Sequence, residues 1–318
     1  MIDLRSDTVT RPTREMLEFM MAARVGDMVF DEDPMVNELE EMAAGMFGME
    51  DAIYCPSGTM TNQIAIKAHT KPGDEVICSR MAHIYQFEGG GVAFNSGASV
   101  ALIDSENGIF TTDDVQEYIN NPNDWHKAFT KLVEVENTVN RGAGSCWDFE
   151  ELKKLRDLCN SHNLGYHLDG ARLFNAMAAD GRQPAEYGAL FDSISICLSK
   201  GLGAPVGSLL LGHRDLIRQG ERIRKVFGGA MRQAGYIAAA GIYALKNNLV
   251  RLTEDHRNAG IIAEALKECS LVEKVNYGGT NIVIFILVPG VKASEFLENL
   301  SGQGILALKT GERSIRIV

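Results

Sequence analysis

Lys200 has the setting in this sequence that most favours covalent chemistry. It follows the apolar run 193–198 and opens a glycine-rich SKGLG turn at 199–203. A lysine withdrawn from water at the end of a buried strand gives up its proton more readily and can form a Schiff base with a carbonyl compound. The order GxxxxGK[ST] of a phosphate-binding loop is absent. An ordinary surface lysine at the end of a strand is the alternative interpretation.

Asp169 stands at the end of a second apolar run, within the segment HLDGAR at 167–172. In open α/β sheets, the carboxyl ends of parallel strands form the edge at which ligands bind. A carboxylate among apolar neighbours is costly to bury unless it meets a cation. Two cations remain open as partners, a protonated ring nitrogen of a cofactor and the side chain of Arg172.

Two further segments have features of a phosphate site. Ser57, Gly58 and Thr59 stand between a predicted strand and a predicted helix, where free backbone N–H groups and hydroxyls bind anions. Lys225 and Arg232 flank a Gly-Gly turn in a stretch of small and apolar residues. Each segment also has an ordinary interpretation, a helix cap for the first and solvated cations for the second.

Together these segments supply the parts that a pyridoxal-5′-phosphate (PLP) site needs. They occur in the order phosphate cradle, acid and lysine along the chain, and one helix–strand unit separates Asp169 from Lys200. PLP enzymes pair a lysine that holds the cofactor with an acid at the pyridine nitrogen, which keeps the ring an electron sink. The combination therefore predicts a PLP enzyme.

The elements that must position these residues alternate along the chain. Strands are predicted at 51–55, 75–78, 99–103, 131–135, 165–169, 193–198 and 208–211, with amphipathic helices at 57–70, 111–119 and 148–163 between them. This alternation predicts an α/β fold with a mostly parallel sheet and helices on both faces. After Ala238-Ala239-Ala240, a long helix is expected to lead to a smaller α+β domain with strands at 281–287 and 314–318.

Composition limits the classes of partner. The 318 residues are 45% apolar and carry a net charge of −11, which does not attract phosphate backbones, so no nucleic-acid ligand is expected. No signal peptide and no membrane span are expected, so we expect a cytoplasmic protein. The six cysteines are scattered without a CxxC pair, and neither a disulfide framework nor a metal site is predicted.

Six segments of the sequence resemble the L-threonine aldolases of the low-specificity type. They are RSDTVTRPT (5–13), GDMVFDEDPMVNELE (26–40), PSGTMTN (56–62), ENTVNRGAG (136–144), HLDGARLFNA (167–176) and LSKGLGAPVGS (198–208). The similarity runs from Leu4 to nearly the end of the chain. It implies the aspartate-aminotransferase-like fold (PLP fold type I) and a relation to the β-eliminating lyases. The domains expected are an N-terminal arm and helix at 1–28, a PLP-binding large domain at 29–245 and a small C-terminal domain at 246–318.

The resemblance also implies a role for each matching residue. Lys200 would hold PLP, Asp169 would pair with the pyridine nitrogen, and His83 would stack on the ring. Arg172 would contact the ring oxygen and the substrate carboxylate, which Ser6 and Arg316 would also bind. Ser57, Gly58 and Thr59 would bind the phosphate, with Lys225 and Arg232 from a neighbouring subunit. His126 would lie near the substrate hydroxyl, and the base would be His83, His126 or a water that they hold.

The reaction implied is cleavage of L-threonine, L-allo-threonine and related β-hydroxy-α-amino acids to glycine and an aldehyde, as a step in threonine catabolism. The assembly implied is a homotetramer, in which two dimers with shared active sites associate. A PLP-dependent β-eliminating lyase and a non-catalytic PLP-fold protein that binds an amino acid stay open as alternatives.

The sequence departs from the family at three places. Family members commonly carry a tyrosine and a glycine before Glu-Asp-Pro, where this chain has Phe30 and Asp31. They often have a histidine after Glu-Asn-Thr, where this chain has Val139. These positions are expected near the substrate pocket and therefore bear on the range of substrates. The family also continues past the strand of Arg316, so the small domain is expected to lack its last helix.

Overall fold

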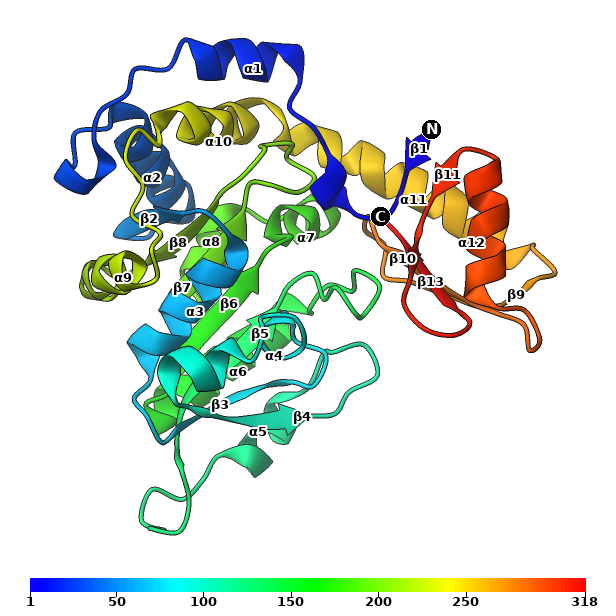
Figure 1. The fold of residues 1–318 in the computed structure, drawn as a ribbon. Coiled ribbons are helices and arrows are strands. Elements are labelled where there is room, and N and C mark those ends of the chain that lie inside the picture. Colours follow the sequence, from blue (N-terminus) through cyan, green and yellow to red (C-terminus); the bar gives the residue numbers. More distant parts are fainter.

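A seven-stranded sheet organises the larger part of the chain (Figure 1). The computed structural model describes residues 1–318, and the strand order is β2-β8-β7-β6-β5-β3-β4. The strands are β2 (Asp51–Cys55), β3 (Asp74–Ser79), β4 (Ser99–Ile103), β5 (Phe129–Glu136), β6 (Gly165–Gly170), β7 (Ser193–Cys197) and β8 (Ser208–Gly212). All neighbours from β7 to β4 are parallel, whereas β8 is antiparallel to both β2 and β7. The predicted mostly parallel sheet is confirmed.

Helices cover both faces of this sheet. The helices of this part are α1 (Arg14–Met21), α2 (Pro34–Phe47), α3 (Gly58–His69), α4 (His83–Gln86), α5 (Thr112–Tyr118), α6 (Phe149–His162), α7 (Leu173–Asp180), α8 (Pro184–Gly188), α9 (Arg214–Val226) and α10 (Gly235–Asn247), of which α1 packs on α10. Short 3₁₀ turns occur at Asp7–Val9 and Met28–Phe30, and a π-turn at Val92–Ser96. Side chains of β2 show the two faces, because Ile53 belongs to an apolar cluster with residues of α3 and α9, whereas Tyr54 belongs to a separate cluster that includes residues of α2 and α10.

The smaller part of the chain contains a four-stranded antiparallel sheet in the order β12-β13-β10-β9. Its elements are α11 (Leu252–Lys267), β9 (Val272–Tyr277), β10 (Val283–Leu287), α12 (Ala293–Gly302), β11 (Ile305–Leu306), β12 (Leu308–Lys309) and β13 (Ser314–Ile317). The N-terminal strand β1 (Ile2–Asp3) pairs in parallel with β11. The N-terminal arm therefore crosses from β11 in the smaller part to the larger part of the molecule (Figure 1).

The long helix expected after the three alanines is α11, which leads into the small sheet. Ala238, Ala239 and Ala240 lie inside α10 and are fully buried. A 3₁₀ turn at Leu249–Arg251 then separates α10 from α11. At the break, the side-chain amide of Asn248 donates to the carbonyl oxygen of Leu202 (2.7 Å), which ties the connection to the turn after Lys200. None of the helices combines the length and apolar character needed to span a bilayer.

Candidate functional site

The N-terminus of α3 forms an open anion cradle. Ser57 caps the helix, because its hydroxyl accepts a hydrogen bond from the backbone N–H of Met60 (3.2 Å). The first N–H groups of a helix have no intrahelical partner and point outward, so those of Gly58 and Thr59 remain for a ligand. A Cβ atom on Gly58 would lie 2.6 Å from the sulfur of Cys197 at the end of β7. Glycine therefore lets the cradle approach the edge of the sheet that carries Lys200.

Asp169 lies at the end of β6 and is buried. Its Oδ2 accepts from the side-chain amide of Asn62 (2.8 Å), and its Oδ1 accepts from the backbone N–H of Ala171 (3.1 Å). Arg172 is not its partner. The internal ion pair between Asp169 and Arg172, which the sequence left open, is therefore wrong, and Asp169 has no cationic side chain of the protein as its partner.

The partner of Arg172 is Asp7, which comes from the N-terminal arm. The Nε and Nη2 groups of Arg172 donate to the two carboxylate oxygens of Asp7, each at 2.7 Å. Asn281 also donates to Asp7 (3.3 Å). Burial would raise the pKa of Asp7, but the charge and hydrogen bonds of Arg172 hold it below its ordinary value. This bidentate pair uses one edge of the guanidinium and leaves Nη1 of Arg172 for another ligand.

Lys200 follows β7 and makes no side-chain hydrogen bond or ion pair within the chain. Its positive charge acts on two buried acids, Asp7 and Glu136. Glu136 ends β5 beside Asp169, to which it is paired in the sheet. Burial, followed by the charge of Asp169, raises the pKa of Glu136 to about 7. Lys200 is thus an amine at the sheet edge that has carboxylates around it but is hydrogen-bonded to none of them.

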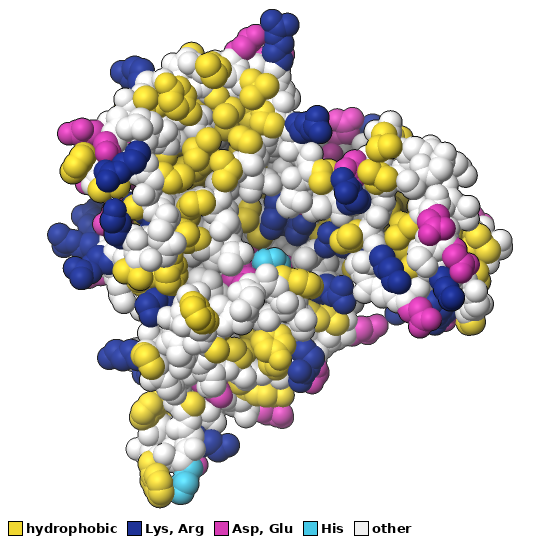
Figure 2. Space-filling view, in the orientation of Figure 1, with side chains coloured by type: hydrophobic (Ala, Val, Ile, Leu, Met, Phe, Trp, Pro, Cys, Tyr) yellow, Lys and Arg dark blue, Asp and Glu magenta, His cyan; other side chains and the backbone are white.

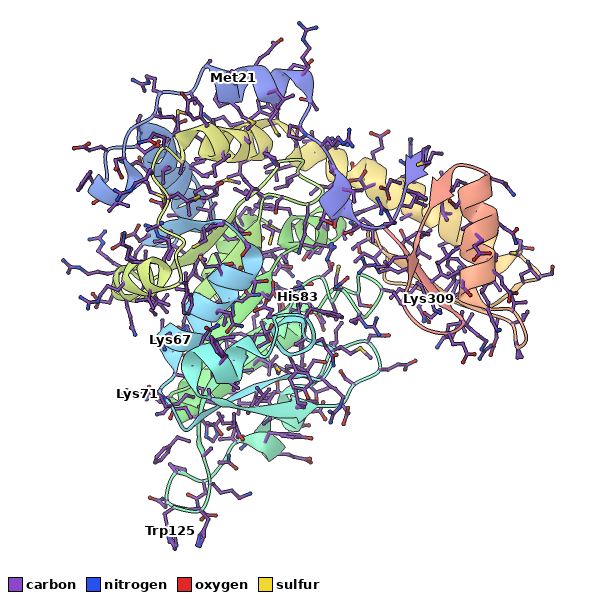
Figure 3. All side chains as sticks on the ribbon, in the orientation of Figure 1. Met21, Lys67, Lys71, His83, Trp125 and Lys309 are labelled. Carbon is purple, nitrogen blue, oxygen red and sulfur yellow. The ribbon has the colours of Figure 1, made fainter.

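His83 begins α4 and lies at the centre of the molecule, between its two parts (Figure 3). Its Nδ1 is 2.9 Å from Oε1 of Glu88, and its backbone N–H donates to Glu136 (3.1 Å). Burial alone would lower the pKa of His83. The hydrogen bond with Glu88 and the charge of Asp169 outweigh burial, so the pKa of His83 is raised. Glu88 thereby engages Nδ1 of the ring and leaves Nε2 for other chemistry.

One more acid lies deeper on the same strand. Glu134 is two residues before Glu136 and is fully buried, and neither of its carboxylate oxygens has a hydrogen-bond partner. Burial, followed by the charges of Asp169 and Glu136, raises the pKa of Glu134 well above its ordinary value. Burial thus favours the protonated form of Glu134 in the folded protein.

The acids around His83 have a spacing that metal sites also show. One ligand atom each from His83, Glu88 and Asp169 lies within 4.8 Å of the others. These atoms are already engaged, because the Asn62 amide donates to both carboxylates and His83 is hydrogen-bonded to Glu88. We therefore interpret the group as a hydrogen-bonded cluster and name no metal ligands.

Arg316 comes from β13 and approaches the same region from the small sheet. Its Nη1 donates to the side chain of Asn140 (2.9 Å), and its Nη2 donates to the backbone oxygen of Arg5 (3.2 Å). Burial, followed by the positive charge of Arg172, lowers the pKa of Arg316. The buried Nε of Arg316 has no partner. Two guanidinium groups thus converge where an anionic ligand would relieve their repulsion.

A cavity of about 320 Å³ adjoins these groups. Ser6, Asp7, Gly201 and Asn281 are among the residues that line it. The hydroxyl of Ser6 accepts from the backbone N–H of Thr8 (3.3 Å), which holds the arm in a 3₁₀ turn. Figure 2 shows a hollow between the two parts of the molecule, with a histidine at its floor and Lys and Arg side chains around it.

Three of the predicted site residues do not join this cluster within one chain. His126 is exposed in a projecting loop and contacts only Asp124 and Trp125, whose labelled side chain is remote from His83 in Figure 3. The side chain of Lys225 makes no ion pair or hydrogen bond within the chain. Arg232 is exposed and paired with Asp27 (2.9 Å).

Sequence reasoning missed four residues that structure this site, namely Asp7, Asn62, Glu88 and Glu136. Asp7 and Asn62 lie inside the RSDTVT and PSGTMTN segments, next to residues that were singled out. A buried acid needs a partner, so the acid in RSDTVT was the signal for Asp7. Asn62 and Glu88 gave no local signal, because polar residues in a helix or loop are ordinarily expected at the surface.

This sheet, with an acid at the end of β6, a lysine directly after β7 and a reversed β8, has the fold of the type I PLP-dependent enzymes. A solved structure of a threonine aldolase from Leishmania major superimposes with a TM-score of 0.84 and 20% identity, covering 100% of this chain and 93% of that one.

The sequence matches the β-eliminating lyase family over residues 3–287. It is 47% identical to the low specificity L-threonine aldolase of Escherichia coli (strain K12), covering 96% of this chain and 90% of the relative. It is 38% identical to the low-specificity L-threonine aldolase 1 of Arabidopsis thaliana, covering 100% of this chain and 90% of that one. The chain therefore belongs to the β-eliminating lyase family.

Proposed function

We propose that the protein is a PLP-dependent aldehyde-lyase that cleaves L-threonine, L-allo-threonine and related β-hydroxy-α-amino acids to glycine and an aldehyde. The observation that carries this proposal is the convergence of an uncommitted lysine, a buried acid and two guanidinium groups at one sheet edge. The relatives at 47% and 38% identity are named low-specificity L-threonine aldolases, which favours this reaction over others of the fold.

The residues present fit PLP. The open N-terminus of α3 and the glycine at position 58, where a Cβ would meet Cys197, suit the phosphate. Asp169 has no protein cation as partner and suits the protonated pyridine nitrogen, and Lys200 suits the aldehyde carbon. When bound, PLP supplies an electron sink for cleavage of a bond at Cα.

The arginines would orient the substrate. Nη1 of Arg172, with Arg316 and the hydroxyl of Ser6, would hold the substrate carboxylate. Asp7 fixes the plane of the Arg172 guanidinium through two hydrogen bonds. Orientation decides which bond at Cα is broken, so a carboxylate clamp that aligns Cα–Cβ selects aldol cleavage over removal of the α-proton.

His83 would manage the proton of the β-hydroxyl. Glu88 holds the ring through Nδ1, so Nε2 of His83 is available to take the proton directly or through a water. His126 lies in an exposed loop and would serve only a site on a neighbouring subunit.

The assembly and cell compartment belong to the same proposal. Lys225 and Arg232 would complete the phosphate site of a neighbour in a homodimer, and two dimers would form a tetramer. We also propose domain boundaries at 28/29 and 245/246, a cytoplasmic location, and a role in threonine catabolism that yields glycine.

The test is a product analysis with L-threonine, L-allo-threonine and L-serine as substrates. The purified protein with PLP is incubated with each, and glycine, aldehyde and ammonia are measured separately. We expect glycine and acetaldehyde in equal amounts from both threonine isomers, with no ammonia. Ammonia together with a keto acid, and no glycine, would instead identify a β-eliminating lyase.

A further inference from the structure

A continuous line of buried polar side chains runs between α3 and the sheet and ends on the acids of the site. Ser193 Oγ lies 2.9 Å from Nε2 of His69 and 2.9 Å from Nδ1 of His167. Nε2 of His167 lies 3.3 Å from Oδ1 of Asn62. The Nδ2 group of Asn62 then donates to Asp169 (2.8 Å) and to Glu88 (2.9 Å). Asn62, His167 and Ser193 are at most 2% exposed.

The acids fix the direction of the first hydrogen bonds. Ionised carboxylates only accept, so both hydrogens of the Asn62 amide point to Asp169 and Glu88. The oxygen of the same amide therefore faces His167, whose Nε2 must carry a hydrogen to donate.

The two histidines fix the remaining directions. Burial lowers the pKa of His167 to about 3 and that of His69 to about 4, so both rings are neutral. A neutral ring with its hydrogen on Nε2 accepts at Nδ1. Nδ1 of His167 therefore accepts from the hydroxyl of Ser193, which in turn accepts from Nε2 of His69.

The hydroxyl of Ser193 decides between two tautomers of His167. The carbonyl oxygen of Ser193 also lies near Nδ1 of His167 (3.2 Å) and would accept a hydrogen there. In that tautomer, Nε2 would turn a lone pair toward the oxygen of Asn62 and repel it. The hydroxyl, held by His69, offers its hydrogen to Nδ1 and so favours the tautomer that supports Asn62.

We propose that His69, Ser193, His167 and Asn62 form a positioning relay that aims Asp169 at the pyridine nitrogen of PLP and Glu88 at His83. The inference rests on the proposed function in one respect, since it needs PLP as the ligand of Asp169. None of the four residues touches the reacting atoms, so they act through the two acids. The relay couples the acid at the cofactor to the acid at His83, because one amide group donates to both.

The experiment compares two serines on β7. Ser193 belongs to the relay, whereas Ser195 is equally buried and is hydrogen-bonded to Thr61, outside the relay. Ser193→Ala and Ser195→Ala remove the same hydroxyl from the same strand. The holoenzymes are prepared with PLP labelled with ¹⁵N in the ring and with ¹⁵N-histidine, and the affinity for PLP is measured by titration.

We expect His167 to carry its hydrogen on Nε2 in the wild type and to move it to Nδ1 in Ser193→Ala. The ring nitrogen of PLP should then lose part of its protonation, and PLP should bind about tenfold more weakly. Ser195→Ala should leave the tautomer of His167, the protonation of the ring nitrogen and the affinity for PLP unchanged. His167→Leu should weaken PLP binding as Ser193→Ala does, and His167→Gln should recover part of the loss because its amide can still donate to Asn62.

Two results would overturn the relay. One is a hydrogen on Nδ1 of His167 in the wild type, and the other is unchanged PLP affinity and ring protonation in both Ser193→Ala and His167→Leu. A wild type that binds PLP but does not form glycine from threonine would refute the proposed reaction instead. In that case, the tautomer of His167, the signal of the PLP ring nitrogen and the affinity for PLP would still test the relay.

Discussion

Asp7 and Arg172 show how one buried ion pair can organise a site. Two charges taken out of water cost free energy that only good geometry offsets. Here the geometry is a two-point contact at 2.7 Å, supported by Asn281. The pair ties the N-terminal arm to the end of β6 and fixes the plane of Arg172. Losing Asp7 would leave a buried arginine uncompensated, so the arm is part of the site.

At Lys200, replacement by alanine should abolish covalent binding of PLP and lower turnover by at least about 10³-fold, with the fold retained. The reason is that Lys200 is the lysine next to Asp169 and the cradle, and its side chain has no partner of its own. The measurement is borohydride reduction followed by peptide mass spectrometry. Lys246→Ala, which removes a surface lysine paired with Glu38, is the control and should retain the adduct on Lys200. An adduct on another lysine in Lys200→Ala would reject the assignment.

At Glu88, replacement by glutamine should move the acidic limb of the pH profile of kcat/KM to lower pH. His83 accepts a proton only in its neutral form, so activity rises as pH increases through its pKa. Glu88 raises that pKa, and an uncharged amide would raise it less. The matched control is Glu134→Gln, which replaces a carboxyl whose pKa is raised by burial and which has no hydrogen bond to His83. A limb that stays in place in Glu88→Gln would show that His83 is not the group that titrates.

At the scale of elements, β5 carries a group that works against stability. Glu134 lies fully buried in the middle of the sheet without a hydrogen-bond partner. Its pKa is raised in the folded state, while the unfolded chain releases the proton at about pH 4.3. Folding therefore binds a proton, and the contribution of Glu134 to the free energy of unfolding falls as pH rises above that value.

Glu134→Leu should raise the free energy of unfolding at pH 8 by about 1–3 kcal/mol, because a buried acid is replaced by an apolar side chain of similar volume. The gain should shrink toward pH 5. Urea unfolding at both pH values measures it. Glu134→Gln should remove the same pH dependence without the apolar gain. An equal pH dependence in the wild type and Glu134→Leu would mean that Glu134 is ionised in the fold.

The strand ends are where sequence reasoning succeeded. Lys200 and Asp169 each follow a run of apolar residues, and parallel strands end at a common edge, so their proximity follows from local patterns. The cap at Ser57 is equally local. The reversal of β8 was not predicted, because an apolar run does not reveal its direction. Its reason is the short connection of ten residues from β7, which carries no helix and returns the chain antiparallel.

Long-range partners are where sequence reasoning stopped. Asp7 meets Arg172 across 165 positions, and Asn62 meets Asp169 across 107. In the helix of GTMTNQIAIKAH, Asn62 and Gln63 would be assigned to the surface by polarity, yet both are buried. Their partner Glu88 comes from a loop with no periodic pattern. Such contacts depend on tertiary packing, which a local window of sequence does not contain.

At the scale of the whole molecule, several features face away from the site of their own chain. His126, Lys225 and Arg232 are exposed or contact other groups. Figure 2 shows hydrophobic side chains gathered over the face that carries α1 and α10, and Leu17, Phe19 and Met21 are exposed on α1. An apolar surface of this kind agrees with the dimer proposed above. A second copy of the chain would cover it.

Complementation tests whether the active site is shared. The cradle at Gly58 and Thr59 offers neutral donors, and a phosphate with close to two negative charges needs cations as well. If Arg232 serves the neighbouring subunit, Arg232→Ala and Lys200→Ala should each be nearly inactive. In a hybrid dimer of the two variants, one site carries both lesions and the other carries neither.

Random exchange of the two inactive variants should therefore restore about one quarter of the wild-type activity. Subunit exchange is followed by native mass spectrometry, and activity by the release of glycine. The control is Lys200→Ala mixed with Lys200→Met, which should stay inactive because every site lacks the lysine. Full exchange without recovered activity would place Arg232 in the site of its own chain or outside any site. Its pair with Asp27 would then be its whole role.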